Sequence, residues 1–250
     1  MNGDPHCMTW NGTWYDYHGV CDLVLIHAPD LDMRVHVRTK ARNDYSYIET
    51  AALSIGDDVL EVSSWGDFAL NDVDHALLIH HGDKKGVSTL SGYPIYHRQP
   101  FAKHHIFDVV LDPNENITIS TFKDLVSVRI SGGAAKHFGS SQGMMGSFDG
   151  VMLARDGSTV MSNPNAFGQE WQVHDDEPQL FVRAPHYPGK CIFPSQRGKK
   201  TEVGRACLRK TLAKSAAEDA CSHLSGEKKD ACVFDVLATG DADIARTSTY

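Results

Sequence analysis

The chain has 250 residues, of which 41 % are hydrophobic and 22 % are charged. These proportions are ordinary for a folded globular protein, so they exclude disorder as the dominant state and allow a sizeable core in one large or two small domains. The formal net charge of −8 disfavours nucleic acid or an anionic membrane as a partner, because either attracts a basic surface. No apolar run approaches the roughly 20 residues that a membrane-spanning helix needs.

The cysteines and sequons point to an oxidising compartment. The six cysteines are an even number without a Cys-x-x-Cys pair, which favours disulfides over a zinc ribbon or a thioredoxin-like site. They are Cys7, Cys21, Cys191, Cys207, Cys221 and Cys232. Asn11 and Asn116 each begin a sequon for N-glycosylation. We expect an extracellular or cell-surface location, and because no signal peptide precedes the first motif, we expect a segment of a longer precursor.

Residues 5 to about 175 carry the pattern of short strands joined by turns. Apolar and polar residues alternate in residues 33–39 and 125–131, as they do in half-buried strands. Further strands are predicted over residues 23–26, 45–55, 58–64, 75–81, 104–111 and 116–122. Short strands at this spacing predict a mainly β fold, an antiparallel β-sandwich or barrel.

The pattern changes after about residue 176. Residues 177–200 contain several prolines and little periodicity, which predicts an irregular linker. Residues 201–250 are rich in helix formers. Ser215 and Glu218 have the spacing of a capping box, and a second helix is expected between Ser225 and Gly240. Because this tail is too short to bury a core by itself, we expect disulfides to hold its helices together.

Three motifs, in order, resemble the von Willebrand factor type D domain family. GDPHCMTWNGTWYDYHGVCDLVLI (3–26) resembles the opening of that domain, and GMMGSFDG (143–150) and FGQEWQV (167–173) resemble its glycine loop and its closing motif. The resemblance covers about two-thirds of the chain and implies an antiparallel β-sandwich domain over residues 1–176. Residues 231–241 are similar to the cysteine-containing helical extension that follows some type D domains.

The resemblance implies a non-catalytic module that acts in adhesion, matrix assembly or protein–protein interaction, with an extracellular protein or matrix component as its partner. Two alternatives stay open. The acidic balance and HDDEP (174–178) suggest a carbohydrate- or mineral-binding module, for which an exposed aromatic platform would favour sugar and a flat carboxylate array would favour mineral. Certain secreted luciferases also contain type D domains, so part of a secreted oxidase- or luciferase-type enzyme is the other alternative.

The resemblance also implies a structural Ca²⁺ between the turn at Asn11 and the glycine loop. The matching positions would supply the oxygens that calcium prefers from Asn11, Ser147, Asp149, the carbonyl of Val151, and Asp156. An amide and a hydroxyl stand where family members have stronger ligands, which predicts a weak site. The other interpretation is that the aspartates lie in ordinary turns. A glycan on Asn11 would substitute its amide nitrogen and would conflict with a metal.

The disulfide pattern departs from that of the family. Met145 replaces the cysteine of the glycine loop, so Cys21 lacks its usual kind of partner. Cys7 lies on a strand that is expected to neighbour the one carrying Cys21, and a Cys7–Cys21 disulfide is therefore predicted. The other four cysteines allow three pairings, and the sequence does not choose among them.

The sequence carries little sign of catalysis. None of the fourteen histidines belongs to an HExxH motif, and His36 and one member of each pair, His80-His81 and His104-His105, are expected to face solvent. His6 and Cys7 are neighbours on a strand, so their side chains diverge. Self-cleavage of the Asp4-Pro5 bond, assisted by His6, is known for some members of the wider family and is the remaining reaction.

Aromatic and glycine residues of the motifs are expected to have structural roles. The predicted core anchors are Trp10, Tyr15, Tyr17, Phe148 and Trp171. Gly143, Gly146 and Gly150 are expected to adopt backbone conformations that other residues rarely reach.

Overall fold

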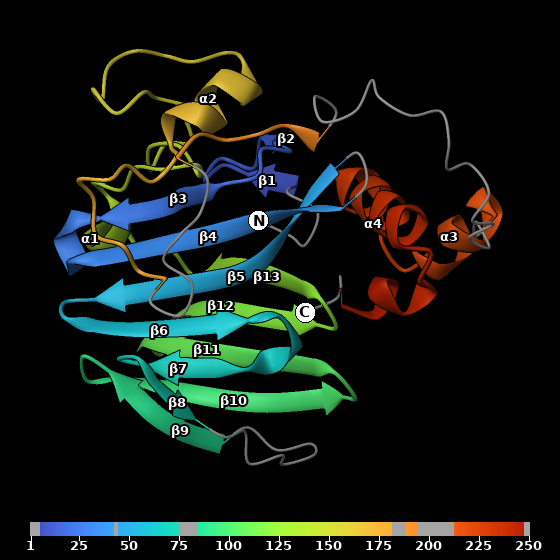
Figure 1. The fold of residues 1–250 in the computed structure, drawn as a ribbon, viewed down its shortest axis with the longest axis horizontal. Helices are drawn as coiled ribbons and strands as arrows, with labels where there is room; N and C mark the ends of the chain where they lie inside the picture. The colour runs from blue at the N-terminus through green and yellow to red at the C-terminus, as the bar shows by residue number, and fades with distance from the viewer. Residues whose placement is uncertain (1–5, 43–44, 76–84, 182–188, 195–212, 248–250) are drawn as a thin grey trace. The chain divides into compact units, whose positions relative to one another are not determined.

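The computed structural model describes residues 6–42, 45–75, 85–181, 189–194 and 213–247 (Figure 1). The chain divides into two compact units, Met1–Ser195 and Gln196–Tyr250. The boundary between them falls within residues 177–200, where the sequence predicted a linker. Each unit is described by itself below.

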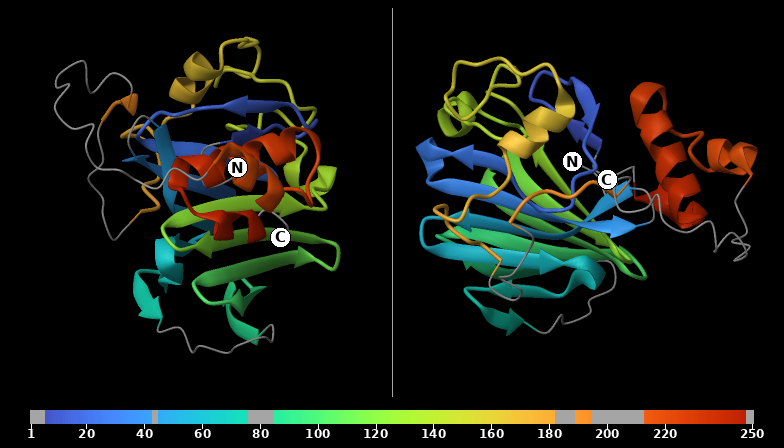
Figure 2. Two further views of the ribbon diagram at one scale, coloured as in Figure 1. Left: turned by 90° about the vertical axis from the view of Figure 1, so that its right-hand side faces the viewer. Right: turned by 45° about the horizontal axis from the view of Figure 1, so that its top comes forward.

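The first unit is built from antiparallel sheets, as the sequence predicted (Figures 1 and 2). Sheet 1 runs in chain order through β3 (Asp22–Ala28), β4 (Met33–Arg42), β5 (Tyr45–Ile55), β6 (Asp58–Ser63), β7 (Phe68–Leu70) and β8 (Val73–His75). Sheet 2 contains β9 (Lys85–Leu90), β10 (Tyr93–Phe101), β11 (His104–Asp112), β12 (Glu115–Phe122) and β13 (Leu125–Ser131). A short ribbon pairs β1 (His6–Met8) with β2 (Trp14–Asp16). Short helices lie between or after the strands: η1 (Pro29–Leu31), η2 (Ser64–Gly66), α1 (Ala135–Phe138) and α2 (Pro164–Glu170).

Several strands escaped prediction for physical reasons. β10 contains Pro94 and Pro100, and proline normally argues against a strand that is paired on both sides. The sheet accommodates Pro100 where the β10–β11 register shifts between Arg98 and Phe101. β9 is mostly exposed and lacks apolar alternation because it pairs only with β10 in the described structure. Of the predicted strand over 75–81, residues 76–81 lie outside the described residues.

Both sheets contribute to one hydrophobic cluster. Val35 and Leu53 from sheet 1 and Ile119 and Val128 from sheet 2 are among its buried members. The rings of Phe68 (sheet 1) and Phe107 (sheet 2) lie 5.1 Å apart. Alternate residues of the strands point into this cluster. This arrangement produces the alternation of apolar and polar residues from which the strands were predicted.

The predicted anchors and glycines belong to the same core. Tyr15, Tyr17 and Trp171 are buried, whereas Trp10 and Phe148 are half-buried and pack against the cluster with ring centroids 5.3 Å apart. The predicted glycines all have positive φ: 131° at Gly143, 76° at Gly146 and 83° at Gly150. The prediction for the glycines is confirmed, and that for the anchors is confirmed for the three buried side chains, whereas Trp10 and Phe148 lie at the edge of the core.

The prediction that His36 faces solvent is wrong, since its exposed fraction is only 1 %. His36 lies opposite Ala52 on sheet 1, and Ala52 packs against Leu180 and Phe181. The segment that contains these two residues therefore covers this face of sheet 1. Burial lowers the pKa of His36 to about 3, which keeps its ring neutral.

The prediction also fails for the pair on β11, because both of its members are buried. His104 packs against the ring of Phe101, with centroids 4.6 Å apart. His105 lies against the tight turn at Gly66. The His80-His81 pair lies outside the described residues.

A buried ion pair joins β3 to β4 beneath the segment that contains Phe181. Arg38 donates from Nε to Asp22 Oδ1 and from Nη2 to Asp22 Oδ2, both over 2.7 Å, and its guanidinium lies 4.5 Å from the centre of the Phe181 ring. Asp22 and Arg38 are directly opposite in the strand register. The bidentate geometry compensates two charges that burial would otherwise penalise.

The second unit contains α3 (Lys214–Ala220), α4 (Gly226–Thr239) and η4 (Ala242–Arg246). As predicted, α4 follows Ser225 and ends at Gly240, whose φ is 68° and whose N–H donates to Val236 O. The predicted capping box is wrong, because α3 already begins at Lys214 and places Ser215 inside the helix. Among the described helices, none combines the length and the apolar character that crossing a membrane requires.

The buried pair gives a stability prediction. Asp22→Asn removes the carboxylate that accepts two hydrogen bonds from the buried Arg38, and we expect it to lower the free energy of unfolding by about 3–5 kcal/mol. The matched control is Lys40→Gln, which breaks the more exposed Lys40–Glu49 pair and is expected to cost less than about 1 kcal/mol. Urea denaturation followed by tryptophan fluorescence measures both. Equal effects of the two substitutions would contradict the prediction.

Candidate functional site

The turn at Asn11 and the glycine loop meet, as the family resemblance implied. A Cβ atom on Gly150 would lie 2.3 Å from Asn11 Cγ, so the two segments are in direct contact and the position requires glycine. The N–H of Trp10 donates to Met145 O over 3.1 Å, which joins the same segments through the backbone. The structure thus brings one predicted ligand position beside the loop that carries Ser147, Asp149 and Val151.

The oxygens of these positions already accept hydrogen bonds. Asn11 Oδ1 accepts from Thr9 Oγ1 at 2.7 Å and from the hydroxyl and N–H of Thr13 at 2.9 and 3.1 Å. Ser147 donates its hydroxyl to Asp149, and its N–H donates to Val151 O over 2.9 Å. The hydrogen bond from Ser147 lowers the pKa of Asp149.

Asp156 holds its own turn. Its Oδ1 accepts from the N–H groups of Ser158 and Thr159, both at 2.8 Å, and its Oδ2 accepts from Thr159 Oγ1 at 2.6 Å. These hydrogen bonds hold the pKa of Asp156 well below its usual range. The described residues contain no cluster of three or more His, Cys, Asp or Glu side chains that could hold a metal. The donor set therefore fits calcium poorly, and calcium binding stays a prediction of the family resemblance.

The disulfides differ from the predicted pairing. The described residues form two, Cys21–Cys191 and Cys221–Cys232. The predicted Cys7–Cys21 bond is wrong: Cys7 keeps its thiol and is buried opposite Tyr15 in the β1–β2 ribbon. Cys207, the sixth cysteine, lies outside the described residues.

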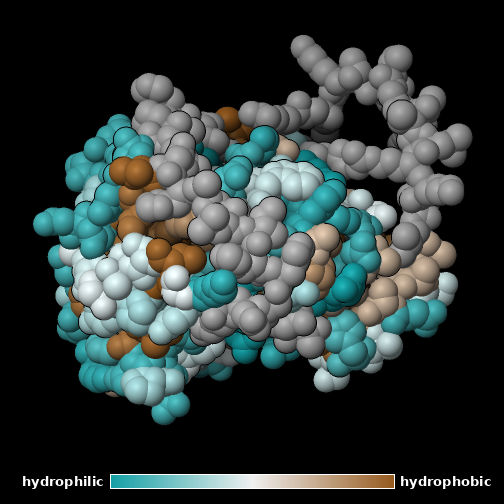
Figure 3. Space-filling model, turned by 90° about the horizontal axis from the view of Figure 1, so that it is seen from below, coloured by the Kyte–Doolittle hydropathy of each residue, from teal (hydrophilic) through white to brown (hydrophobic). Residues whose placement is uncertain are grey.

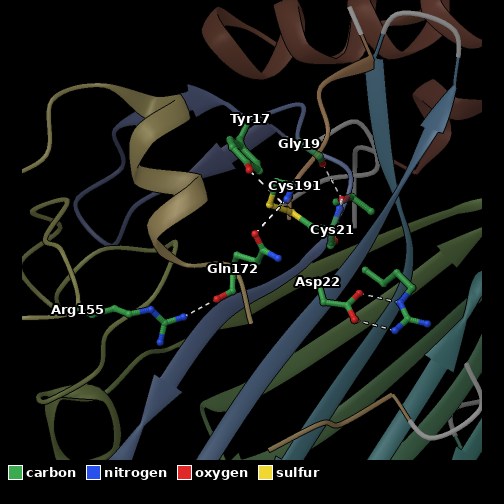
Figure 4. Close-up of a disulfide and its surroundings, with 9 residues drawn as sticks. Tyr17, Gly19, Cys21, Asp22, Arg155, Gln172 and Cys191 are labelled. Atoms are coloured by element: carbon green, nitrogen blue, oxygen red, sulfur yellow. Dashed lines mark hydrogen bonds and ion pairs between the residues drawn. A yellow bond between two sulfur atoms is a disulfide. The ribbon is translucent and has the colours of Figure 1, made fainter. Parts of the chain in front are cut away.

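The Cys21–Cys191 bond depends on contacts between segments that are distant in the sequence (Figure 4). Val20 and Ile192 form a β-bridge with N···O distances of 2.9 and 3.3 Å, which places Cys191 beside Cys21. The side-chain oxygen of Gln172 accepts from the N–H of Cys191 at 3.0 Å. The Tyr17 hydroxyl lies 3.9 Å from Cys21 Sγ. Residues 191 and 192, which belong to the predicted linker, are thus bonded to the residues just before β3.

The remaining sequence-predicted positions have identifiable surroundings. Asp4 and Pro5 lie outside the described residues, and His6 Nδ1 lies 2.6 Å from Asp16 Oδ1. Of the sequon asparagines, Asn11 is exposed, while Asn116 is half-buried and donates from Nδ2 to Asp108 and Thr118 over 3.3 and 3.2 Å. The geometry leaves Asn11 the more accessible position for a glycan.

Trp65 has an unusual setting that the sequence pattern did not reveal. Its side chain is 50 % exposed and its φ is 73°, which is rare for a bulky residue. The available signal was a tryptophan followed by glycine in a short connection between strands, which propensity alone does not distinguish from an ordinary turn.

No protein-family model matches the chain. The likeness to von Willebrand factor type D domains therefore rests on the three motifs and stays a prediction.

The saturated oxygens around Asn11 lead to a prediction for metal binding. We expect calorimetric titration with Ca²⁺ to show no saturable site tighter than about 0.1 mM, because calcium affinity follows the number of charged, available oxygens. Adding Ca²⁺ should then change the melting temperature of the Asp149→Asn variant no differently from that of the parent chain. A tight site that Asp149→Asn abolishes would contradict this expectation.

Peptide mapping under non-reducing conditions tests the pairing. We expect one cross-linked peptide pair containing Cys21 and Cys191 and another containing Cys221 and Cys232. Because Cys7 is only 1 % exposed, it should react with an alkylating agent only after denaturation. A peptide pair joining Cys7 to Cys21 would instead support the pairing that the sequence suggested.

Proposed function

We propose that this chain is a non-catalytic module of an extracellular or cell-surface protein, acting in adhesion, matrix assembly or protein–protein interaction. The observation that carries the proposal is the Cys21–Cys191 disulfide, which joins residues 170 positions apart within the sheet-bearing unit. Disulfides that close so long a loop stabilise a fold strongly and persist in oxidising compartments.

The architecture that we propose is a type D-like β-sandwich with sheets 1 and 2 as its layers. The shared hydrophobic cluster and the Phe68–Phe107 contact support this arrangement. The helical unit would be the disulfide-stapled extension, which the Cys221–Cys232 bond supports. The contact between Asn11 and Gly150 supports the family likeness, because it joins the opening motif to the glycine loop.

Several buried charged side chains connect elements of the fold, which supports a structural role for them. Glu115 accepts from the N–H of Ala134 and lies 2.5 Å from His137 Nδ1, which anchors α1 to β12. Asp22 and Arg38 connect strands in the same way. On the face shown in Figure 3, the residues that are not drawn in grey form small hydrophobic areas between hydrophilic ones.

Carbohydrate binding is a second candidate function, and one observation favours it. Trp65 presents half of its side-chain surface to solvent, and an exposed aromatic side chain is the feature that favours a sugar ligand over a mineral.

The proposal is tested with beads coated with the oxidised full-length chain. We expect the beads to cluster with each other or to be retained on immobilised matrix proteins or polysaccharides. Replacing Cys21 and Cys191 together by serine should reduce retention and lower the melting temperature. The matched control is to replace Cys221 and Cys232 together by serine, which also removes one disulfide, but one that closes only a short loop. A folded, oxidised chain that neither clusters nor binds any component of the panel would overturn the proposal.

A further inference from the structure

Loops from both sheets meet at one end of the sheet-bearing unit. The turn η2 follows β6 of sheet 1, whereas Lys103 and Lys123 lie in the hairpin turns β10–β11 and β12–β13 of sheet 2. The N–H of Trp65 donates to Lys123 O over 2.8 Å, and the N–H of Lys123 donates to Lys103 O over 3.1 Å. Backbone hydrogen bonds therefore hold these positions together.

Trp65 is held in a conformation that disfavours it. A φ of 73° brings Cβ close to backbone oxygens, and glycine or asparagine would adopt it at lower cost. The turn is also tightly seated, because a Cβ atom on Gly66 would lie 2.5 Å from the His105 ring. The indole contributes little to the core, since half of it is exposed. Strain of this kind with no gain in burial points to a functional side chain.

Two lysines lie at these turns, and one of them is beside the exposed indole. Lys103 Nζ lies 5.3 Å from the centre of the Trp65 ring, and Lys123 Nζ lies 4.8 Å from the centre of the neighbouring Phe122 ring. Of the acidic residues close by in the sequence, Asp124 is paired with Arg42 over 2.9 Å, and Asp67 is exposed. Lys103 therefore places a positive charge beside the exposed ring, although the whole chain carries a net charge of −8.

We propose that Trp65, Lys103 and Lys123 form a binding site for an acidic polysaccharide. One apolar face of a sugar ring would stack on the indole, and the ammonium groups would bind a carboxylate or sulfate on that ring or the next. This inference rests on the proposed function of the chain as a matrix-binding module and names the class of ligand.

A sugar fits the site better than single-stranded nucleic acid does. Proteins that bind single strands combine a basic groove with several aromatic side chains for successive bases, whereas this surface presents one exposed tryptophan. An acidic sugar combines an apolar face and one charge within a single ring, which matches one indole beside an ammonium group.

The experiment measures binding of the full chain to defined oligomers by calorimetry at low and high salt. The probes are polygalacturonate oligomers for carboxylates, dextran sulfate for sulfates, dextran as the neutral control and oligo(dT) for nucleic acid. Saturable binding to either acidic probe and none to dextran is expected. The stronger of the two acidic probes identifies the anion.

Variants separate the ring from the fold. Trp65→Asn relieves the backbone conformation, so we expect an equal or higher melting temperature together with about tenfold or greater loss of affinity. Trp65→Phe should restore part of the binding. Lys103→Gln should weaken binding and reduce its salt dependence, whereas Lys85→Gln, an exposed lysine on β9, is the matched control and should change neither.

The possible failures are distinguishable. Unchanged affinity of Trp65→Asn, or binding to oligo(dT) but to neither acidic sugar, would overturn this inference while leaving the adhesive function intact. An oxidised chain that binds acidic sugar through Trp65, but whose beads show neither clustering nor retention, would overturn the proposed function and support the site.

Discussion

The outer edge of β3 is the constraint on which the sheet-bearing unit depends. β3 is the first strand of sheet 1, and an unpaired edge would expose backbone donors and acceptors to other chains. Distant segments cover it instead: His27 exchanges hydrogen bonds with Gln142, and Val24 donates to Trp171 O. The Cys21–Cys191 bond fixes a third segment beside the start of the strand. The segments containing the glycine loop, the closing motif and Cys191 thus share one structural role, which is to cover the edge of β3.

The hydrogen bonds along this edge hold loops that have no regular secondary structure. The glycine loop follows Gln142, which is hydrogen-bonded to β3. Its contact with Asn11 brings the β1–β2 ribbon close to this edge of sheet 1. The far end of the unit is organised differently, because Trp65, Lys103 and Lys123 are joined by backbone hydrogen bonds between hairpin turns. A frame held by sheet pairing can keep a strained tryptophan exposed, which a flexible loop would not.

Sequence reasoning was reliable where local pattern decides structure. Alternation located β4 and β13, and the glycines of the 143–150 motif signalled positive φ, because only glycine reaches such angles at low cost. It failed where a distant segment intervenes. His36 alternates like a surface residue, yet Phe181 and Leu180 bury its face of sheet 1. The contact of Asn11 with the glycine loop was implied by resemblance, but the hydrogen bonds that occupy its oxygen were not.

By itself, the sequence determined that the chain is mainly β with antiparallel strands, that a helical part follows, and that the glycines of residues 143–150 have positive φ. These properties follow from side-chain periodicity and from local backbone energies, which act within a few residues. Only the tertiary structure decided that Cys21 bonds to Cys191, that Asn11 Oδ1 is already occupied, and that Trp65 stands beside Lys103. Those contacts join residues from separate loops, and their closeness is set by how the strands pair and pack rather than by any local preference.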